Sequence, residues 1–145
     1  REAVVLREGE ERVTDRDPDE VEVTAPRGFI VDPDGAIVRA GLVRNWAARH
    51  GLTMLDEHIA YLTGDAIPAG YSGFPFIEAV PLRSLKNVLA AHGAGAVEIL
   101  VRGVDVDPDQ LRKKLKLRGS QQMAVVIARV GDSAVAHVCG SRVHA

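Results

Sequence analysis

The chain has 145 residues, of which 46% are hydrophobic and only 4% are aromatic. That length can bury one core or two small ones, built mainly from Val, Leu, Ile and Ala. No apolar run approaches the roughly 20 residues that span a bilayer, and nothing near the start resembles a signal peptide. Cys139 is the single cysteine, which excludes a disulfide framework and a cysteine-based zinc site. These features predict a cytoplasmic, soluble protein with no membrane partner.

The formal net charge of −2 hides an uneven distribution of charge along the chain. Residues 1–34 carry eleven acids and five bases, whereas residues 35–145 carry nine acids and thirteen bases. A basic C-terminal part on a mildly acidic chain predicts a local anionic partner. The chain also opens at Arg1 without a methionine, so we expect it to be a piece of a longer protein that continues before residue 1.

Residues 1–72 predict a strand-rich linker region that contains one helix. Apolar or alternating runs indicate short strands at Ala3–Arg7, Val21–Thr24, Phe29–Val31, Leu52–Leu55 and Ile59–Thr63. The charged stretch Glu8–Glu20 predicts a loop or an exposed hairpin tip, and Gly64–Gly73 predicts a second loop. Helical spacing over Ile37–His50, with Gly51 as its stop, predicts the helix.

Residues 73–145 show a clearer pattern, which predicts the order β-α-β-α-β-β. The six elements are expected at Phe74–Val80, Leu82–His92, Ala96–Val101, Pro108–Arg118, Met123–Val130 and Ala134–Val138. The predicted fold class is therefore α/β (α+β): a small β-rich and helical segment, followed by a two-layer module with its helices on one face of a sheet.

The helix expected at Pro108–Arg118 carries the strongest functional signal. Asp107 is suited to cap its start and Gly119 to end it. Leu111 and Leu115 define a buried stripe, and the basic side chains Arg112, Lys113, Lys114, Lys116 and Arg118 lie around it. Acids at the start and cations at the end also match the helix dipole, so the pattern fits either a structural role or binding of a phosphate backbone. Arg102 and Arg129, on neighbouring strands, could extend the basic patch.

Other patterns are weaker. The spacing Asp105-x-Asp107-x-Asp109 begins like a calcium loop, but Gln110 and Lys116 stand where that loop needs Gly and Glu. The run Asp56–His58 could serve acid–base chemistry or a metal, yet no second His or Cys stands at ligand spacing, so a free-standing enzyme built on it is the third hypothesis. We assign no catalytic, cofactor-binding or metal-binding residues to the chain.

The segment EILVRGVDVDPDQLRKKLKLRG, followed by MAVVIARVGDSAVAHV, resembles the THUMP-like domain at the C-terminus of bacterial class I S-adenosylmethionine-dependent methyltransferase-like proteins. VDPDGAIVRAGLV and HIAYLTGD fit the region that precedes that domain in the same proteins. The resemblance implies a methyltransferase domain before this chain, with S-adenosylmethionine as cofactor of the parent protein and none in this fragment. It also implies RNA, either tRNA or rRNA, as a partner, with phosphate contacts from Arg102, Arg112, Lys113, Lys116 and Arg118.

Two hypotheses for the chain as a whole rank ahead of the free-standing enzyme. In the first, it is the C-terminal accessory region of an S-adenosylmethionine-dependent methyltransferase and binds or presents RNA through the basic helix. In the alternative, it is a protein–protein interaction module, which docks on its own methyltransferase domain or forms a homodimer.

Overall fold

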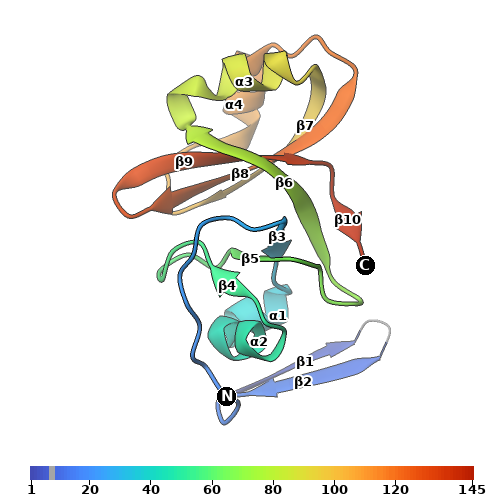
Figure 1. Cartoon of the computed structure of the whole chain (residues 1–145), viewed down its shortest axis with the longest axis vertical. Coiled ribbons are helices and arrows are strands. Elements are labelled where there is room, and N and C mark those ends of the chain that lie inside the picture. The colour runs from blue at the N-terminus through green and yellow to red at the C-terminus, as the bar shows by residue number, and fades with distance from the viewer. Residues whose placement is uncertain (7–8) are drawn as a thin grey trace. The chain divides into compact units, whose positions relative to one another are not determined.

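The computed structural model describes residues 1–6 and 9–145 (Figure 1). The chain divides into a first unit of residues 1–73 and 143–145 and a second unit of residues 74–142. Each unit has its own hydrophobic cluster. The predicted strand residue Arg7 and the predicted loop residue Glu8 lie outside the described part. The mixed α/β architecture confirms the predicted fold class.

The first unit opens with a hairpin of two antiparallel strands, β1 (Glu2–Leu6) and β2 (Glu10–Thr14). The expectation of a loop was wrong for β2, and the expected strand at Val21–Thr24 is reduced to an isolated bridge between Val23 and Met54. The charged residues of β2 hide the alternation of inward and outward side chains that is typical of a strand. Val13 is fully buried on the inner face, and the inward carboxylate of Glu11 is held by hydrogen bonds.

The remaining elements of the first unit are short. They are β3 (Phe29–Asp32), α1 (Gly35–Arg39), α2 (Val43–Arg49), β4 (Thr53–Met54), β5 (Leu62–Gly64) and β10 (Val143–His144). Strands β4, β5 and β3 lie side by side in that order. The last strand, β10, pairs antiparallel with Ser72 and Gly73 at the start of β6.

The helix expected over Ile37–His50 is in fact two helices, α1 and α2. The chain turns between them at Gly41, whose φ of 70° lies in the left-handed region that glycine adopts without steric cost. Asp34 begins α1, because its carboxylate accepts a hydrogen bond of 2.8 Å from the backbone N–H of Ala36. The predicted stop at Gly51 is confirmed by its φ of 67° just after α2.

The core of the first unit forms where the hairpin covers the two helices. Trp46 of α2, Ile37 of α1 and Leu42 between them are fully buried, and they belong to one cluster with the inward residues of β1 and β2. Because a two-stranded hairpin alone is marginally stable in water, this packing is what holds β1 and β2 in place.

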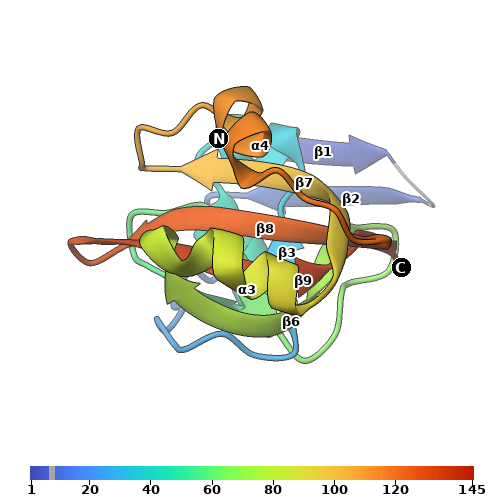
Figure 2. The same ribbon diagram turned by 90° about the horizontal axis from the view of Figure 1, so that it is seen from above.

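The second unit is a four-stranded sheet with helices on one face (Figure 2). Its elements are β6 (Ser72–Pro81), the 3-10 turn η1 (Leu82–Ser84), α3 (Leu85–Ala91), β7 (Ala94–Arg102), α4 (Pro108–Leu115), β8 (Gln121–Val130) and β9 (Ser133–Gly140). The strands lie in the order β6-β9-β8-β7, and β7 and β8 are parallel, whereas the other pairs are antiparallel. The predicted order β-α-β-α-β-β is confirmed, except that η1 forms the first turn of the first predicted helix.

Alternate residues of the strands meet the helices in one apolar cluster. Leu85 and Leu89 of α3 and Leu115 of α4 pack with Val125 and Ile127 of β8. This confirms the predicted leucine stripe on α4, with Leu111 partly buried against the same cluster. The packing fixes which side of α4 faces away from the sheet.

The end of α4 differs from the prediction. The helix stops at Leu115, and Lys116 takes a left-handed conformation with φ of 48°, so Gly119 does not end it. Gly119 instead allows two backbones to approach closely: its N–H donates to the carbonyl of Ala94 at 3.0 Å, and a Cβ there would overlap the carbonyl group of Gly93. The glycine is therefore explained by a contact between distant segments.

We predict that Gly119→Ala destabilises the second unit by about 1–3 kcal/mol or more, because the methyl group would overlap backbone that cannot move aside. Urea unfolding followed by circular dichroism measures the change. Gly140→Ala is the control, since its Cβ would lie 3.5 Å from the nearest atom of Pro75, an ordinary contact. Equal stability of the two variants would contradict this reading of Gly119.

Candidate functional site

The basic segment begins with a well-capped helix start. The Asp107 carboxylate accepts hydrogen bonds from the backbone N–H groups of Asp109, at 2.9 Å, and Gln110, at 3.4 Å. Pro108 occupies the first turn, where its missing N–H costs nothing. The predicted cap is therefore confirmed, and Asp107 has a structural role.

Four cations surround the end of this helix and face solvent. Lys113 and Lys114 lie in its last turn, Lys116 follows it, and Arg118 lies two residues further on. We call these four residues the cation cluster. All four are exposed, and within the described residues none of their charged groups forms a salt bridge. The short helix thus concentrates uncompensated positive charge at its C-terminal end, beyond what its dipole alone requires.

Arg112, one of the predicted phosphate contacts, makes two hydrogen bonds within the fold. Its Nη1 donates to the Asp109 carboxylate at 2.9 Å, and its Nε donates to the carbonyl oxygen of Val97 at 3.3 Å. Val97 belongs to β7, the edge strand of this sheet, so Arg112 covers one carbonyl on that edge. It is exposed but already paired, unlike the cation cluster.

Arg102 lies away from the cation cluster. On the same strand, β7, the side chains of Val97, Ile99 and Val101 all pack in the hydrophobic core beneath the helices. Because successive side chains of a strand point to opposite faces, Arg102 projects from the other face of the sheet. By the same alternation Arg129 of β8 follows Ile127 onto the helix face, so the two arginines do not extend one patch.

A second cluster of polar side chains, in the first unit, was not predicted. The carboxylate of Glu11 on β2 accepts hydrogen bonds from Trp46 Nε1 at 3.0 Å and from Arg49 Nη1 at 3.1 Å. It also interacts with His50 Nε2 at 2.8 Å and with the hydroxyl of Tyr71. Segments separated by up to 60 residues therefore meet at one side chain.

The environment of Glu11 strongly favours its charged form. Burial alone would raise the pKa of this carboxyl, but hydrogen bonds from Tyr71, Trp46, His50 and Arg49 outweigh burial and lower the pKa to about 2. The indole of Trp46 and the phenol ring of Tyr71 lie 4.7 Å apart between centroids, and the Glu11 side chain between these donors is 20% exposed. The group stays ionised at any physiological pH.

The Glu11 cluster is suited to structure and not to proton transfer. Two donors contact each carboxylate oxygen, so little capacity remains for a substrate. A hollow of about 320 Å³ beside it is lined partly by Glu11, His50 and Tyr71. The sequence contains no local signal for this arrangement, because the partners of Glu11 are between 35 and 60 residues away.

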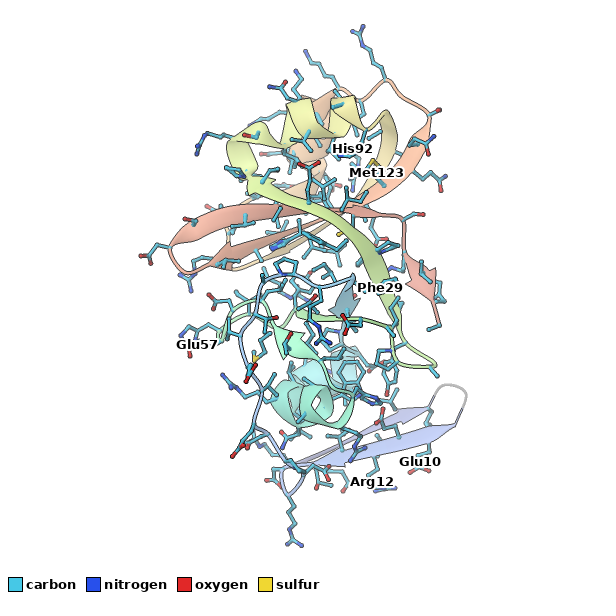
Figure 3. The ribbon with its side chains drawn as sticks, in the orientation of Figure 1. Glu10, Arg12, Phe29, Glu57, His92 and Met123 are labelled. Atoms are coloured by element: carbon cyan, nitrogen blue, oxygen red, sulfur yellow. The ribbon has the colours of Figure 1, made fainter. Side chains whose placement is uncertain are left out.

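The run Asp56–His58 forms an exposed turn in the structure. The Asp56 carboxylate accepts a hydrogen bond of 2.9 Å from the backbone N–H of His58. The side chains of Glu57 and His58 are 65% and 73% exposed, and Figure 3 shows Glu57 pointing outward. Among the described residues, no group of three His, Cys, Asp or Glu side chains is placed to hold a metal ion. None of the helices in the described part is long and apolar enough to cross a membrane.

Comparison with known proteins places the second unit in a family. Residues 72–141 match the family model described as THUMP domain-like. This range contains the four strands of the second unit, β6 to β9, and its helices. Helix α4 connects the parallel strands β7 and β8. The second unit is therefore a THUMP-like domain, which confirms the resemblance seen in the sequence.

Longer proteins resemble nearly the whole chain. An uncharacterized S-adenosylmethionine-dependent methyltransferase of Mycobacterium tuberculosis, found in strains CDC 1551 / Oshkosh and H37Rv, is 52% identical over 140 residues. The match covers 95% of this chain and 39% of that protein, so the chain spans about two fifths of the length of these relatives.

A solved structure of a proposed methyltransferase from Porphyromonas gingivalis W83 also matches, with a TM-score of 0.68 and 19% identity. The match covers 83% of this chain and 31% of that one. At this identity the likeness shows a shared fold alone.

We predict that Glu11→Gln lowers the free energy of unfolding by about 1–3 kcal/mol at pH 7, because buried donors lose a charged acceptor. The folded pKa of about 2 lies below the ordinary 4.5, so the carboxylate stabilises the fold above about pH 4.5 and that contribution is lost as the pH falls towards 2. Urea unfolding at pH 7 and at pH 3 should therefore show a smaller gap between variant and wild type at the lower pH.

The matched control is Glu10→Gln, on the outer face of the same strand. Glu10 pairs with Arg12 at 2.7 Å, but both side chains are at least 50% exposed. Exposed ion pairs contribute about 0–1 kcal/mol, so this variant should stay close to wild type at both pH values. A gap for Glu11→Gln that does not depend on pH would contradict the account of its ionisation.

Proposed function

We propose that this chain is the C-terminal region of an S-adenosylmethionine-dependent methyltransferase, and that its THUMP-like domain binds or presents RNA through the cation cluster. The methyltransferase names of the relatives support the first part. The observation that carries the second part is the contrast within one helix: Arg112 is paired inside the fold, whereas Lys113, Lys114, Lys116 and Arg118 are exposed and form no salt bridge in the described part of the chain.

The cofactor does not fit the described residues of this chain. A dinucleotide or S-adenosylmethionine site of the usual kind needs a glycine-rich turn that leads from a strand into a helix. Gly93 and Gly95 instead lead from α3 into β7, and their backbone is packed against Gly119. Cofactor binding and methyl transfer therefore belong to the rest of the longer protein, and the role proposed for this chain is contact with the substrate.

The chemistry of the cation cluster matches phosphate better than bases. Lysine ammonium groups act as point charges towards phosphate, and their contacts carry no sequence information. The aromatic side chains of the second unit, Phe74 and Phe76, lie within β6 and not on the helix that bears the cations. Among the described residues of the second unit, no Phe, Tyr or Trp ring therefore lies on the helix to stack on a base. Binding should be independent of sequence and sensitive to salt.

We predict that Lys113→Gln weakens binding to RNA of any sequence and lowers the slope of log K against log salt concentration by about 0.7–0.9, the value for one lost phosphate contact. Fluorescence anisotropy with a labelled RNA stem-loop, over a series of salt concentrations, measures both. Lys86→Gln is the matched control, because Lys86 is an exposed lysine on the other helix of the same unit.

Two results would contradict the proposal. One is the absence of measurable RNA affinity at low salt, and the other is an equal loss for Lys86→Gln, which would indicate general charge attraction. Capture of an acidic protein surface by the cation cluster, with no affinity for RNA, would favour the interaction module instead.

A second prediction uses the backbone of Lys116. A lysine in the left-handed region costs roughly 1–2 kcal/mol, a penalty that glycine does not incur. Lys116→Gly should therefore raise the free energy of unfolding by about 0.5–1 kcal/mol while it weakens RNA binding. Urea unfolding and anisotropy on the same preparation test both effects. Lys114→Gly is the comparison, because it places glycine inside the helix and should lower stability; a Lys116→Gly variant that binds RNA like wild type would show that Lys116 makes no contact.

A further inference from the structure

The two edges of the β1–β2 hairpin can be assigned from the pairing pattern. Asp15 N donates to Arg1 O at 3.1 Å, so these two residues form a hydrogen-bonded pair. Along an antiparallel ladder, hydrogen-bonded residue pairs alternate with non-hydrogen-bonded pairs. In a non-hydrogen-bonded pair, the N–H and C=O groups of both residues point away from the partner strand, out of the hairpin. In the observed register, Glu2 opposite Thr14 and Val4 opposite Arg12 are outward-pointing pairs.

The outer edge of β2 is occupied by groups of this same chain. The carbonyl oxygen of Arg12 accepts a hydrogen bond of 2.9 Å from Arg49 Nη1. The N–H of Thr14 donates to the Asp17 carboxylate at 2.9 Å, and the carbonyl of Thr14 accepts from the N–H of Asp17 at 3.1 Å. No further strand can therefore add to β2 without breaking these bonds.

The outer edge of β1 has no such cover. Within residues 1–6 and 9–145, no hydrogen bond reaches the outward N–H or C=O of Val4. An open strand edge is a template for pairing, and proteins normally cover or block it. Groups of this chain therefore satisfy outward backbone groups of β2 at Arg12 and Thr14, whereas in the described residues those of Val4 in β1 have no hydrogen-bond partner.

The outer face of the hairpin carries two exposed apolar side chains next to this open edge. Leu6 is 77% exposed and Val4 is 37% exposed, and both belong to β1. Their neighbours Glu2 and Glu10 are both paired with Arg12, and Figure 3 shows Glu10 and Arg12 on the side of the hairpin away from α2. The single guanidinium offsets one of the two negative charges, so Val4 and Leu6 form the apolar part of this face beside the open edge.

We propose that the outer edge of β1 pairs with a strand of the methyltransferase part of the full-length protein, so that the hairpin extends the sheet of that part. The inference rests on the proposed function, because the partner strand is supplied by the methyltransferase. The relatives contain ample polypeptide for it, since the chain matches only 39% of their length. Backbone pairing at Glu2 and Val4 would supply affinity, and burial of Val4 and Leu6 would supply the apolar contact.

Hydrogen exchange detected by NMR tests this pairing. In this chain alone, the amide of Val4 should exchange quickly, whereas the amides of Ala3 and Val5, which point towards β2, should be protected. In the full-length protein the Val4 amide should slow by about 100-fold or more, because it becomes part of an ordered ladder. The result does not depend on RNA binding or on methyl transfer, so failure of the proposed function and failure of this inference are distinguishable.

Proline substitutions give a second, independent measurement. Val4→Pro removes an N–H that makes no bond within the hairpin, so this chain alone should keep its melting temperature within a few degrees, whereas the full-length protein should lose stability. Val5→Pro is the matched control, because it removes an inward N–H and should lower the melting temperature of both proteins.

Rapid exchange of the Val4 amide in the full-length protein would overturn the proposal, as would equal melting shifts for Val4→Pro in the two proteins. A Val4 amide in this chain that becomes protected as concentration rises, together with a dimer in light scattering, would show that a second copy pairs with β1 instead of the methyltransferase part.

Discussion

The first unit depends on a single carboxylate. Glu11 lies on the inner face of β2, where an unpaired carboxylate would be costly to bury. Its carboxylate accepts hydrogen bonds from two side chains of α2 and from Tyr71, which precedes β6. Charged groups become costly inside a protein unless they are paired, so the four donors and their carboxylate are needed together. This interaction holds the hairpin against Trp46, and the hairpin in turn closes the core of the unit. The position of β1, with its open edge, follows from that anchor.

In the second unit one sequence feature has a structural role and, in the function proposed above, a binding role as well. The acids at the start of α4 cap it and pair with Arg112, and these contacts account for much of the charge pattern without any ligand. The cations after Arg112 have no such partners within the described residues, and one of them, Lys116, keeps a strained backbone. The boundary between structural and available charge therefore lies between Arg112 and Lys113, which residue types alone could not indicate.

Sequence patterns predicted the second unit far better than the first. Its elements bury continuous or periodic apolar stripes, as with Leu85 and Leu89 of α3, so the local pattern and the tertiary packing agree. In the first unit, β2 was missed because its inward residue is a glutamate, and the helix pair was read as one helix because Gly41 interrupts an otherwise periodic run. The separation of Arg102 from the cation cluster was missed because it depends on which face of β7 packs against the helices.

The sequence by itself determined the class of fold, the order of elements from β6 to β9, the cap at Asp107 and the family of the second unit. These features depend on residues that are near one another in the chain. Tertiary structure decided the pairing of Arg112 with Val97, the close contact at Gly119, the Glu11 cluster and the open edge of β1. Each of these depends on contacts between segments far apart in sequence, where the chemistry of a residue is set by the neighbours that folding brings to it.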